Sequence, residues 1–347
     1  MKVICLAKTG PKGPASRYRI YQYIPHLRER GMDVEVLPAF PDRYVDLAGS
    51  PAAGASAQRS LLVIAGFLRR LGHFARAMRA DLVVIEREFF PAFPPLFEML
   101  LRVFRRGYIL EFDDAIFLSF GRRMKYPVTV KMARRVIVGN EYLARYARQF
   151  NDRVEVVPTV VDSSRYVPRE DYRLSSPPRI GWVGLPYNFP HLRMVSPALK
   201  KVCEKWEARL VVFSGRSPDL PLPVEFVPWS EEREPEVISS FDAGIMPLAD
   251  TPFARGKCGL KILQYMAAGV PVVASPVGVN RDIISDGVNG FLAASHREWE
   301  EKISILLSDE NLRERMGREG RKTVEERFDL SLWKDEVARI YLEETSR

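Results

Sequence analysis

The chain of 347 residues is 46% hydrophobic and 28% charged, which is ordinary for a soluble globular protein and long enough for two domains that each bury a core. Its three cysteines, Cys5, Cys203 and Cys258, are widely spaced and its four histidines are scattered, which argues against a disulfide framework or a zinc site and favours a reducing cytoplasm. No apolar run approaches the roughly 20 residues that span a bilayer, and the N-terminal apolar stretch is too short for a signal peptide, so we expect a cytoplasmic protein, peripheral to a membrane at most.

Short apolar runs alternate with helical patterns through the first half of the chain. Strands are predicted over 3–6, 34–37, 81–85, 108–112, 135–138 and 154–157, and helices over 17–30, 61–78 and 141–150. This alternation is typical of a parallel sheet with crossover helices. A loop rich in Gly and Pro, residues 9–14, follows the first strand, and Asn140 is predicted to cap the helix 141–150.

Basic residues are concentrated in the first half. Residues 1–173 hold 29 Lys and Arg against 18 Asp and Glu, a net charge of +11, whereas residues 174–347 hold 23 against 26, a net charge of −3. The stretches 59–79 and 122–135 contain no acid, and Phe67, Phe74 and Phe104 are interleaved with arginines. Such patches attract phospholipid or nucleic acid, and the aromatic residues favour a peripheral contact with an anionic membrane. A solvated face that maintains solubility is the alternative.

Carboxylates cluster where the predicted strand 108–112 ends, at Glu111, Asp113 and Asp114. Acids this close together are costly unless they bind something or reach solvent. We therefore predict that Asp113 and Asp114 are catalytic groups, which would orient a substrate hydroxyl. Helix capping or pairing with arginines is the alternative. No pair of acids in the sequence resembles a Mg²⁺ site, so no metal is expected.

A polar, Pro-rich stretch, residues 163–178, is the predicted linker, and the alternating pattern then restarts. Strands are predicted over 179–184, 209–213, 224–227, 243–248 and 271–274, and helices over 199–206, 237–241, 259–268, 297–307, 310–328 and 331–344. The predicted organisation is an α/β fold of two Rossmann-like domains facing each other across a cleft, with ligands at the carboxyl ends of the strands. The predicted domains are 1–170 and 171–330, followed by a C-terminal helix, 331–347, that returns to the first domain.

The predicted helix 259–268 begins just after the strand 243–248, where unpaired N–H groups and the positive end of the helix dipole favour an anion. Lys257, Lys261 and Gln264 are spaced four and three apart, which places them on one helical face, and Arg255 lies just before the helix. We predict that Arg255, Lys257 and Lys261 bind a diphosphate and that Gln264 contacts a hydroxyl of a sugar or ribose. Two solvated lysines and a merely polar Gln are the alternative.

This region resembles the donor site of the retaining GT-B glycosyltransferases of family 4, also called group 1. Three segments match in order and spacing: 241–248 (FDAGIMPL), the helix 259–269, and the stretch from Val277-Gly278 to 287–292 (GVNGFL). The resemblance is specific over 179–347 and weaker over 1–178. It implies that domain 171–330 binds a nucleotide-sugar donor, with Arg255 and Lys261 on its diphosphate and Gln264 on its ribose. The further donor-binding positions that it implies are Gly13, Gly184, Leu248 and Gly278.

One departure separates this chain from many members of that family, which carry two glutamates separated by seven residues. Gly256 and Gln264 take those positions here, which indicates a divergent subfamily. The resemblance implies a hexosyltransferase or other glycosyltransferase that moves a sugar from a nucleotide-diphosphate sugar to an acceptor hydroxyl, with retention by front-side attack. A saccharide or lipid-linked acceptor in cell-surface polysaccharide or glycolipid synthesis would explain the basic patches with interleaved aromatic residues. The nucleotide sugar is a substrate, so no cofactor is expected.

Other functions stay open on the sequence. A nucleotide-sugar epimerase of the same architecture would convert the donor without an acceptor, and a non-catalytic nucleotide-sugar-binding protein would account for the missing glutamates. A nucleic-acid partner is not expected, because the basic residues come without a recognition motif. A dinucleotide dehydrogenase is disfavoured, since no GxGxxG with an acid about 20 residues further on follows the first strand.

Overall fold

The computed structural model of the chain describes residues 1–47, 54–91, 93–104, 107–119 and 121–345. The chain divides into two compact units. Unit 1 comprises Met1–Thr159, Gly256–Cys258 and Ser331–Arg347, and unit 2 comprises Val160–Arg255 and Gly259–Leu330. Residues 163–178, the predicted linker, therefore belong to unit 2.

Unit 1 is built on a six-stranded sheet in the order β2-β1-β3-β4-β5-β6, in which every neighbouring pair is parallel. The chain passes from one side of β1 to the other between β2 and β3, which makes β1 and β3 the switch point where ligands of doubly wound sheets bind. The strands are β1 (Lys2–Leu6), β2 (Asp33–Val36), β3 (Leu82–Glu86), β4 (Tyr108–Phe112), β5 (Arg135–Val138) and β6 (Val154–Val156).

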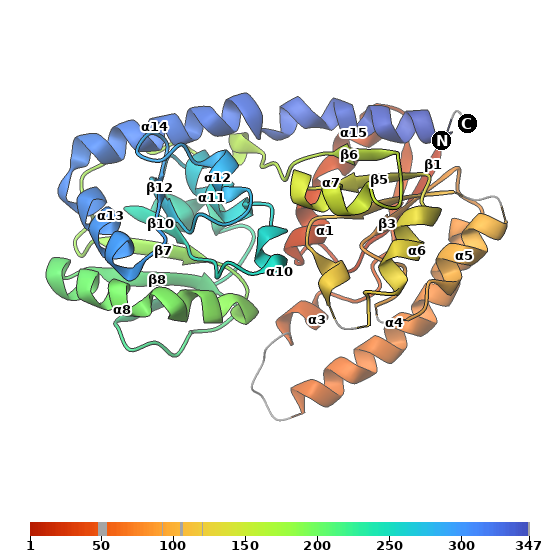
Figure 1. Cartoon of the computed structure of the whole chain (residues 1–347), viewed down its shortest axis with the longest axis horizontal. Coiled ribbons are helices and arrows are strands. Elements are labelled where there is room, and N and C mark those ends of the chain that lie inside the picture. The colour runs from red at the N-terminus through yellow and green to blue at the C-terminus, as the bar shows by residue number, and fades with distance from the viewer. Residues whose placement is uncertain (48–53, 92, 105–106, 120, 346–347) are drawn as a thin grey trace. The chain divides into compact units, whose positions relative to one another are not determined.

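Helices cover the sheet of unit 1, with α4, α5, α6 and α7 packed on one hydrophobic core (Figure 1). The predicted helix 17–30 is divided into three pieces, because the backbone leaves the helical region at Ile20 and Pro25 begins a new helix. The helices are α1 (Pro14–Arg19), α2 (Ile24–Glu29), α3 (Arg43–Asp46), α4 (Ala55–Ala77), α5 (Leu96–Val103), α6 (Lys125–Met132), α7 (Glu141–Ala147) and α15 (Leu330–Thr345), with 3₁₀ turns η1 (Tyr21–Tyr23) and η2 (Ile116–Leu118).

The C-terminal helix α15 is held to unit 1 by ion pairs. Arg135 in β5 lies 3.1 Å from Glu344 (Nε to Oε1) and 2.9 Å from Glu343 (Nη2 to Oε2). Glu344 is fully buried, so its charge requires these arginine partners. Nearer the start of α15, Asp335 Oδ1 lies 2.9 Å from His26 Nε2 of α2. The last helix of the chain therefore packs with residues from its first domain.

Unit 2 repeats the architecture with a six-stranded parallel sheet in the order β12-β11-β10-β7-β8-β9. Its strands are β7 (Arg179–Val183), β8 (Arg209–Ser214), β9 (Val224–Pro228), β10 (Ala243–Met246), β11 (Val272–Ala274) and β12 (Phe291–Leu292). Its helices are α8 (Phe189–Trp206), α9 (Glu234–Ser239), α10 (Pro252–Arg255), α11 (Leu260–Ala267), α12 (Asn280–Ile283), α13 (His296–Ser308) and α14 (Glu310–Arg327), with 3₁₀ turns η3 (Ser163–Arg165) and η4 (Pro186–Asn188).

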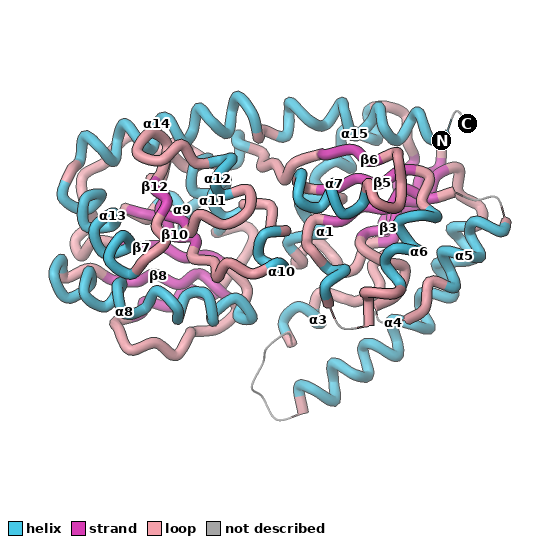
Figure 2. The backbone as a smooth tube through the Cα atoms, in the orientation of Figure 1, coloured by secondary structure: helices cyan, strands magenta, loops and turns pink. Residues whose placement is uncertain are grey.

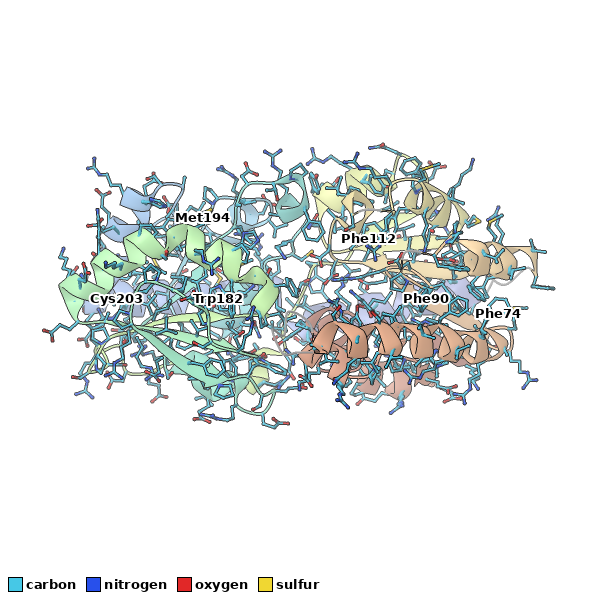
Figure 3. The ribbon with its side chains drawn as sticks, turned by 90° about the horizontal axis from the view of Figure 1, so that it is seen from below. Phe74, Phe90, Phe112, Trp182, Met194 and Cys203 are labelled. Atoms are coloured by element: carbon cyan, nitrogen blue, oxygen red, sulfur yellow. The ribbon has the colours of Figure 1, made fainter. Side chains whose placement is uncertain are left out.

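Helices α8 and α13 pack together on one face of the unit 2 sheet, and α11 packs with α14 on the other (Figures 1 and 2). Trp182 of β7 and Cys203 of α8 belong to the core between α8 and the sheet (Figure 3). Helix α8 begins earlier than the predicted 199–206. Proline usually ends a helix, but Pro197 lies inside α8. The two doubly wound parallel sheets confirm the predicted α/β class with two Rossmann-like units.

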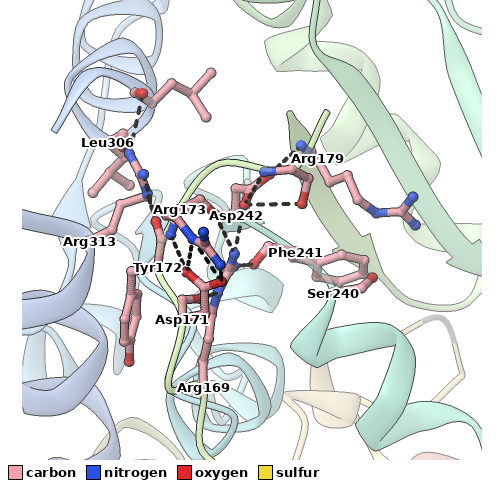
Figure 4. A network of polar contacts seen from close by, with 12 residues as sticks. Arg169, Asp171, Tyr172, Arg173, Arg179, Ser240, Phe241, Asp242, Leu306 and Arg313 are labelled. Carbon is pink, nitrogen blue, oxygen red and sulfur yellow. Dashed lines mark hydrogen bonds and ion pairs between the residues drawn. The ribbon is translucent and has the colours of Figure 1, made fainter. Parts of the chain in front are cut away.

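A buried network ties the stretch 163–178 to unit 2 (Figure 4). Asp242, which is fully buried, accepts hydrogen bonds from Arg169 Nη2 (2.9 Å), Ser175 N (3.2 Å) and Arg179 N (2.7 Å). Nearby, Arg313 of α14 donates through Nη2 to the carbonyl oxygen of Tyr172 (2.6 Å). Because these bonds link residues distant in sequence, the polar, Pro-rich stretch is an integral part of the second unit.

Candidate functional site

The start of α11 is the first part of the candidate site in unit 2. Gly259 caps this helix with φ of +73°, a conformation that favours glycine. A Cβ at this position would lie 2.4 Å from Ile283 Cδ1, so packing also requires glycine. The first turn of a helix presents backbone N–H groups and a positive partial charge to a ligand. The chain thus holds an anion-favouring element just beyond the carboxyl end of β10.

Lys261, in the first turn of α11, lies beside the carboxyl end of β7. Its Nζ is 5.6 Å from the centroid of the Trp182 ring. A Cβ on Gly184 would lie 2.9 Å from Lys261 Cε and 2.8 Å from Trp182 Cη2. The structure therefore brings together two residues that the sequence analysis selected, Gly184 and Lys261, and only the missing side chain of the glycine leaves room for the lysine.

Arg255 and Gly278 form a second close pair in unit 2. Gly278 has φ of +55°, and a Cβ there would lie 2.6 Å from the carbonyl oxygen of Arg255. The Arg255 side chain pairs with Asp250, with Nε 2.6 Å from Oδ1, and both side chains are more than half exposed. Exposed ion pairs contribute little to stability, so an incoming anion can compete for this guanidinium.

The loop after β10 carries Leu248, which is 4% exposed. Its N–H donates to Ser275 Oγ (2.9 Å), and the N–H of Ala249 donates to His191 Nδ1 (3.1 Å). Two backbone amides of the loop thus donate to side chains, those of Ser275 just after β11 and of His191 in α8, and these bonds fix the path of the loop. A contact between this loop and a nucleotide base stays a prediction.

Lys257 does not lie on the helix that carries Lys261 and Gln264, and that part of the spacing argument is wrong. Helix α11 begins at Leu260, so Lys257 precedes the helix, within the three residues that belong to unit 1. Gln264 is 2% exposed, and its Nε2 lies 3.4 Å from Tyr166 Oη inside unit 2. A ribose contact from Gln264 would require these two side chains to separate.

The carboxyl edge of the unit 1 sheet holds Asp113 and Asp114 after β4. Arg87 Nη2 donates to Asp113 Oδ1 (2.8 Å) and to Asp114 Oδ2 (2.7 Å). Burial raises the pKa of Asp114, but the charges of Arg87, Lys257 and Lys8 outweigh it and lower that pKa below the ordinary value of 3.8. Both acids therefore pair with an arginine, which was the alternative to an acceptor-orienting role.

Arg87 is a residue that the sequence analysis did not select. It follows β3 with φ of +65°, which costs a non-glycine residue of order 1–3 kcal/mol and is common at functional sites. Lys8 follows β1, and burial first and then the charge of Arg87 lower the pKa of its side-chain amine to about 8. The position of Arg87 between two acids, Glu86 and Glu88, was the available signal. The switch point of unit 1 thus gathers cations beside the two aspartates.

The loop after β1 is tightly closed around Gly13. A Cβ on Gly13 would lie 1.9 Å from Thr9 Oγ1, and the Gly13 N–H donates to the carbonyl oxygen of Gly10 (3.1 Å). Thr9 Oγ1 lies 3.1 Å from Ser16 Oγ, which donates to Glu86 Oε2 (2.6 Å). Glycine is required at this position by the packing of the loop itself, and a donor contact there stays a prediction.

Asn140 caps α7, as predicted, because its Oδ1 accepts from Leu143 N (3.0 Å). Its Nδ2 donates to the carbonyl oxygen of Gly256 (2.9 Å). Cys258 Sγ donates to the carbonyl oxygen of Asp113 (3.1 Å). These bonds hold residues 256–258 beside the ends of β4 and β5. Among the described residues, no group of three His, Cys, Asp or Glu side chains is arranged to hold a metal ion.

Two comparisons of the sequence with known proteins find similarity to glycosyltransferases. Residues 177–309 match the family model for glycosyl transferases group 1. The capsular polysaccharide biosynthesis glycosyltransferase CapM of Staphylococcus aureus is 33% identical over 92 residues, which are 26% of this chain and 24% of that protein. The chain thus matches about a quarter of the length of this curated relative.

Two solved structures resemble the whole chain. Anabaena Alr3699/HepE in complex with UDP and glucose has a TM-score of 0.71 at 18% identity, covering 98% of this chain and 99% of that one. Sucrose-phosphate synthase of Thermosynechococcus elongatus has a TM-score of 0.74 at 16% identity, covering 99% of this chain and 98% of that one. At these identities the likeness concerns the fold, and it confirms the predicted GT-B fold.

Proposed function

We propose, from the match of residues 177–309 to the family model for glycosyl transferases group 1 and from the GT-B fold, that this protein is a glycosyltransferase which moves a sugar from a nucleotide-diphosphate sugar to an acceptor hydroxyl. The observation that carries the proposal is the position of Lys261. It lies in the first turn of α11, beside the glycine that ends β7. A cation in the first turn of a helix, where the helix dipole is positive, suits a diphosphate.

In the proposed reaction, the diphosphate leaves as the bond between sugar and phosphate breaks. Negative charge grows on the diphosphate oxygens at this step, and Lys261 with the α11 amides stabilises it. Arg255 exchanges its weak pair with Asp250 for a phosphate oxygen. The solved structures of Anabaena HepE hold UDP and UDP-glucose, which makes a uridine nucleotide the first donor to test here.

On the acceptor side, we propose that Asp113 and Asp114 orient the attacking hydroxyl while Arg87 holds both carboxylates. Carboxylates fixed by one guanidinium keep their remaining lone pairs available to a hydroxyl. We propose that transfer proceeds with retention and without a metal ion. The name of the S. aureus relative supports a saccharide acceptor in cell-surface polysaccharide synthesis, and a lipid-linked acceptor would bring the protein to the inner face of a membrane.

Thermal unfolding with nucleotides tests the donor proposal. A ligand present at about 100 times its Kd stabilises the native state by about 2.7 kcal/mol. We therefore expect UDP or a UDP-sugar to raise the Tm, and UMP, which lacks the second phosphate, to have a much smaller effect. A screen in which no nucleoside diphosphate or nucleotide sugar raised the Tm would contradict the proposed donor class. Product analysis without acceptor then separates transfer from epimerisation, since an epimerase converts the donor alone.

Gly184→Ala tests whether Lys261 needs the space that Gly184 leaves open. Because the added Cβ would lie under 3 Å from atoms of both Trp182 and Lys261, we expect a loss of about 1–3 kcal/mol of stability from overpacking. Displacement of the lysine removes a charge-assisted contact worth roughly 1.5–3 kcal/mol, so UDP affinity should fall by about tenfold or more. Isothermal titration measures the affinity.

Gly215→Ala is the matched control for this variant. Gly215 follows the neighbouring strand β8, and a Cβ there would meet only Pro186 atoms at 3.8 Å and beyond. Its stability and its UDP affinity should therefore match those of the unchanged protein. Equal UDP affinity in the two glycine variants would show that Lys261 does not bind the diphosphate.

A further inference from the structure

The outer face of α4 carries an exposed apolar stripe, formed by Leu61, Ile64, Leu68 and Leu71. These side chains are 66%, 60%, 61% and 46% exposed. Their spacing of three, four and three residues places them along one side of the helix, over roughly 15 Å at 1.5 Å per residue. The solvated face of a helix usually carries polar side chains, so four large aliphatic residues in a row are unusual there.

The opposite face of α4 already supplies the contacts that hold the helix in unit 1. Phe67 lies 5.2 Å from Phe90, and Phe74 lies 5.5 Å from Phe97, between ring centroids. Arg70 is 1% exposed and donates to the carbonyl oxygens of Leu37 (2.9 Å) and Ala7 (2.7 Å). The stripe therefore adds nothing to the packing of the core.

The predicted membrane contact at Phe67, Phe74 and Phe104 stays a prediction. Phe67 and Phe74 are partly buried and pack against the core of unit 1. Phe104 is 56% exposed, and it follows α5, which lies beside α4 through the Phe67, Phe74 and Phe97 contacts. Helix α5 itself exposes Met99 (47%) and Val103 (72%). Helix α5 thus also carries exposed apolar side chains.

The charges around this surface have a single sign on α4. Residues 47–80 contain no Asp or Glu, and Arg69, Arg76 and Arg79 are exposed near the stripe. Arg76 pairs with Glu35 at 2.7 Å, but both side chains are partly exposed, so the pair is weak. An apolar ridge edged by arginines matches the interfacial helices that bind anionic bilayers.

We propose that the outer face of α4, together with the exposed end of α5, lies on an anionic phospholipid surface, with the four aliphatic side chains among the acyl chains and the arginines on the headgroups. A second copy of the chain is disfavoured, because self-pairing would oppose identical arginines. The proposal deepens the proposed function by naming the surface from which a lipid-linked acceptor would come, but its test needs no transferase activity.

Cosedimentation of the full chain with vesicles tests the proposal. We expect binding to phosphatidylcholine vesicles that contain phosphatidylglycerol, with affinity rising with the anionic fraction and falling as salt increases. The triple variant Leu61→Gln, Ile64→Gln, Leu68→Gln should bind at least about tenfold more weakly, because apolar burial is lost at three positions. These sites are exposed, so its Tm should be unchanged.

The matched control places the same substitution on exposed apolar residues elsewhere in the chain. Val288, Ile305 and Leu332 are 52%, 44% and 49% exposed, and their triple change to Gln should leave vesicle binding unchanged. Equal binding by the two triple variants, or binding of the unchanged protein that ignores the anionic fraction, would overturn the proposal. So would a dimer, seen by light scattering without lipid, that the Leu61, Ile64, Leu68 variant alone dissociates.

Discussion

Replacing Lys261 by alanine is expected to lower kcat/KM for the nucleotide-sugar donor by about 100- to 1,000-fold, the cost of removing one group that stabilises developing negative charge. Lys261 lies in the first turn of α11, where the helix dipole has the same sign as its ammonium group. Because the diphosphate gains charge only as the sugar departs, the loss should fall more on kcat than on KM. Steady-state measurement of nucleotide release separates the two constants.

Lys201→Ala is the control for this variant, since Lys201 is an exposed lysine of α8 that pairs with Glu300 at 3.2 Å. Its kinetics should be those of the unchanged protein. The Lys261 ammonium also lies over the Trp182 ring, a contact worth about 0.5–1 kcal/mol, so the Tm of Lys261→Ala must be measured to establish that the variant is folded at the assay temperature. A folded Lys261→Ala protein with the kinetics of the control would show that the diphosphate binds elsewhere.

The parallel sheets could be predicted from sequence because their strands are apolar along most of their length. Residues Tyr108–Phe112 and Arg179–Val183 are buried on both faces in the structure, which is the pattern of strands covered by helices on two sides. Prolines explain the main errors in the helices. Pro25 begins a new helix, whereas Pro197 is accommodated inside one, and a local pattern does not distinguish these outcomes.

The candidate site was harder to predict where a side chain depends on distant residues. Periodicity assigned Lys257 to the same helix as Lys261, but the left-handed cap at Gly259 starts the helix after it. Gln264 has the polarity of a ligand contact, yet it lies against Tyr166, which is 98 residues away in the chain. Spacing identifies which residues share a face, and only the tertiary packing decides whether that face is open.

In the basic first half of the chain, the sequence likewise did not show which side chains lie on the surface. Aromatic residues on α4 were the natural candidates for a membrane contact. The polarity of α4 does not identify its core side from sequence, because its buried residues include Arg70 and His73. The neighbouring rings of Phe89, Phe90 and Phe97 select Phe67 and Phe74 for the core, which leaves the leucines outside.

Asp242→Ala is expected to destabilise unit 2 by about 3–5 kcal/mol, the cost of removing one partner from a buried ion pair. The change leaves the Arg169 guanidinium without its carboxylate and the amides of Ser175 and Arg179 without an acceptor. At roughly 2–4 °C per kcal/mol for a domain of this size, the Tm should fall by about 6–20 °C. Circular dichroism gives the Tm, and limited proteolysis shows whether cleavage moves into residues 163–178.

Asp171→Ala provides the comparison, because Asp171 lies in the same stretch and pairs with Arg173 at 2.6 Å, but both side chains are more than half exposed. Solvent screens that pair, so its loss should leave the Tm unchanged. Both aspartates pair with an arginine but only Asp242 is buried, so comparing the two Tm values shows whether burial or charge pairing causes the loss of stability. If Asp242→Ala unfolded at the same temperature as Asp171→Ala, residues 163–178 would act as a linker after all, and the bonds of Arg169 would not hold this stretch to the second sheet.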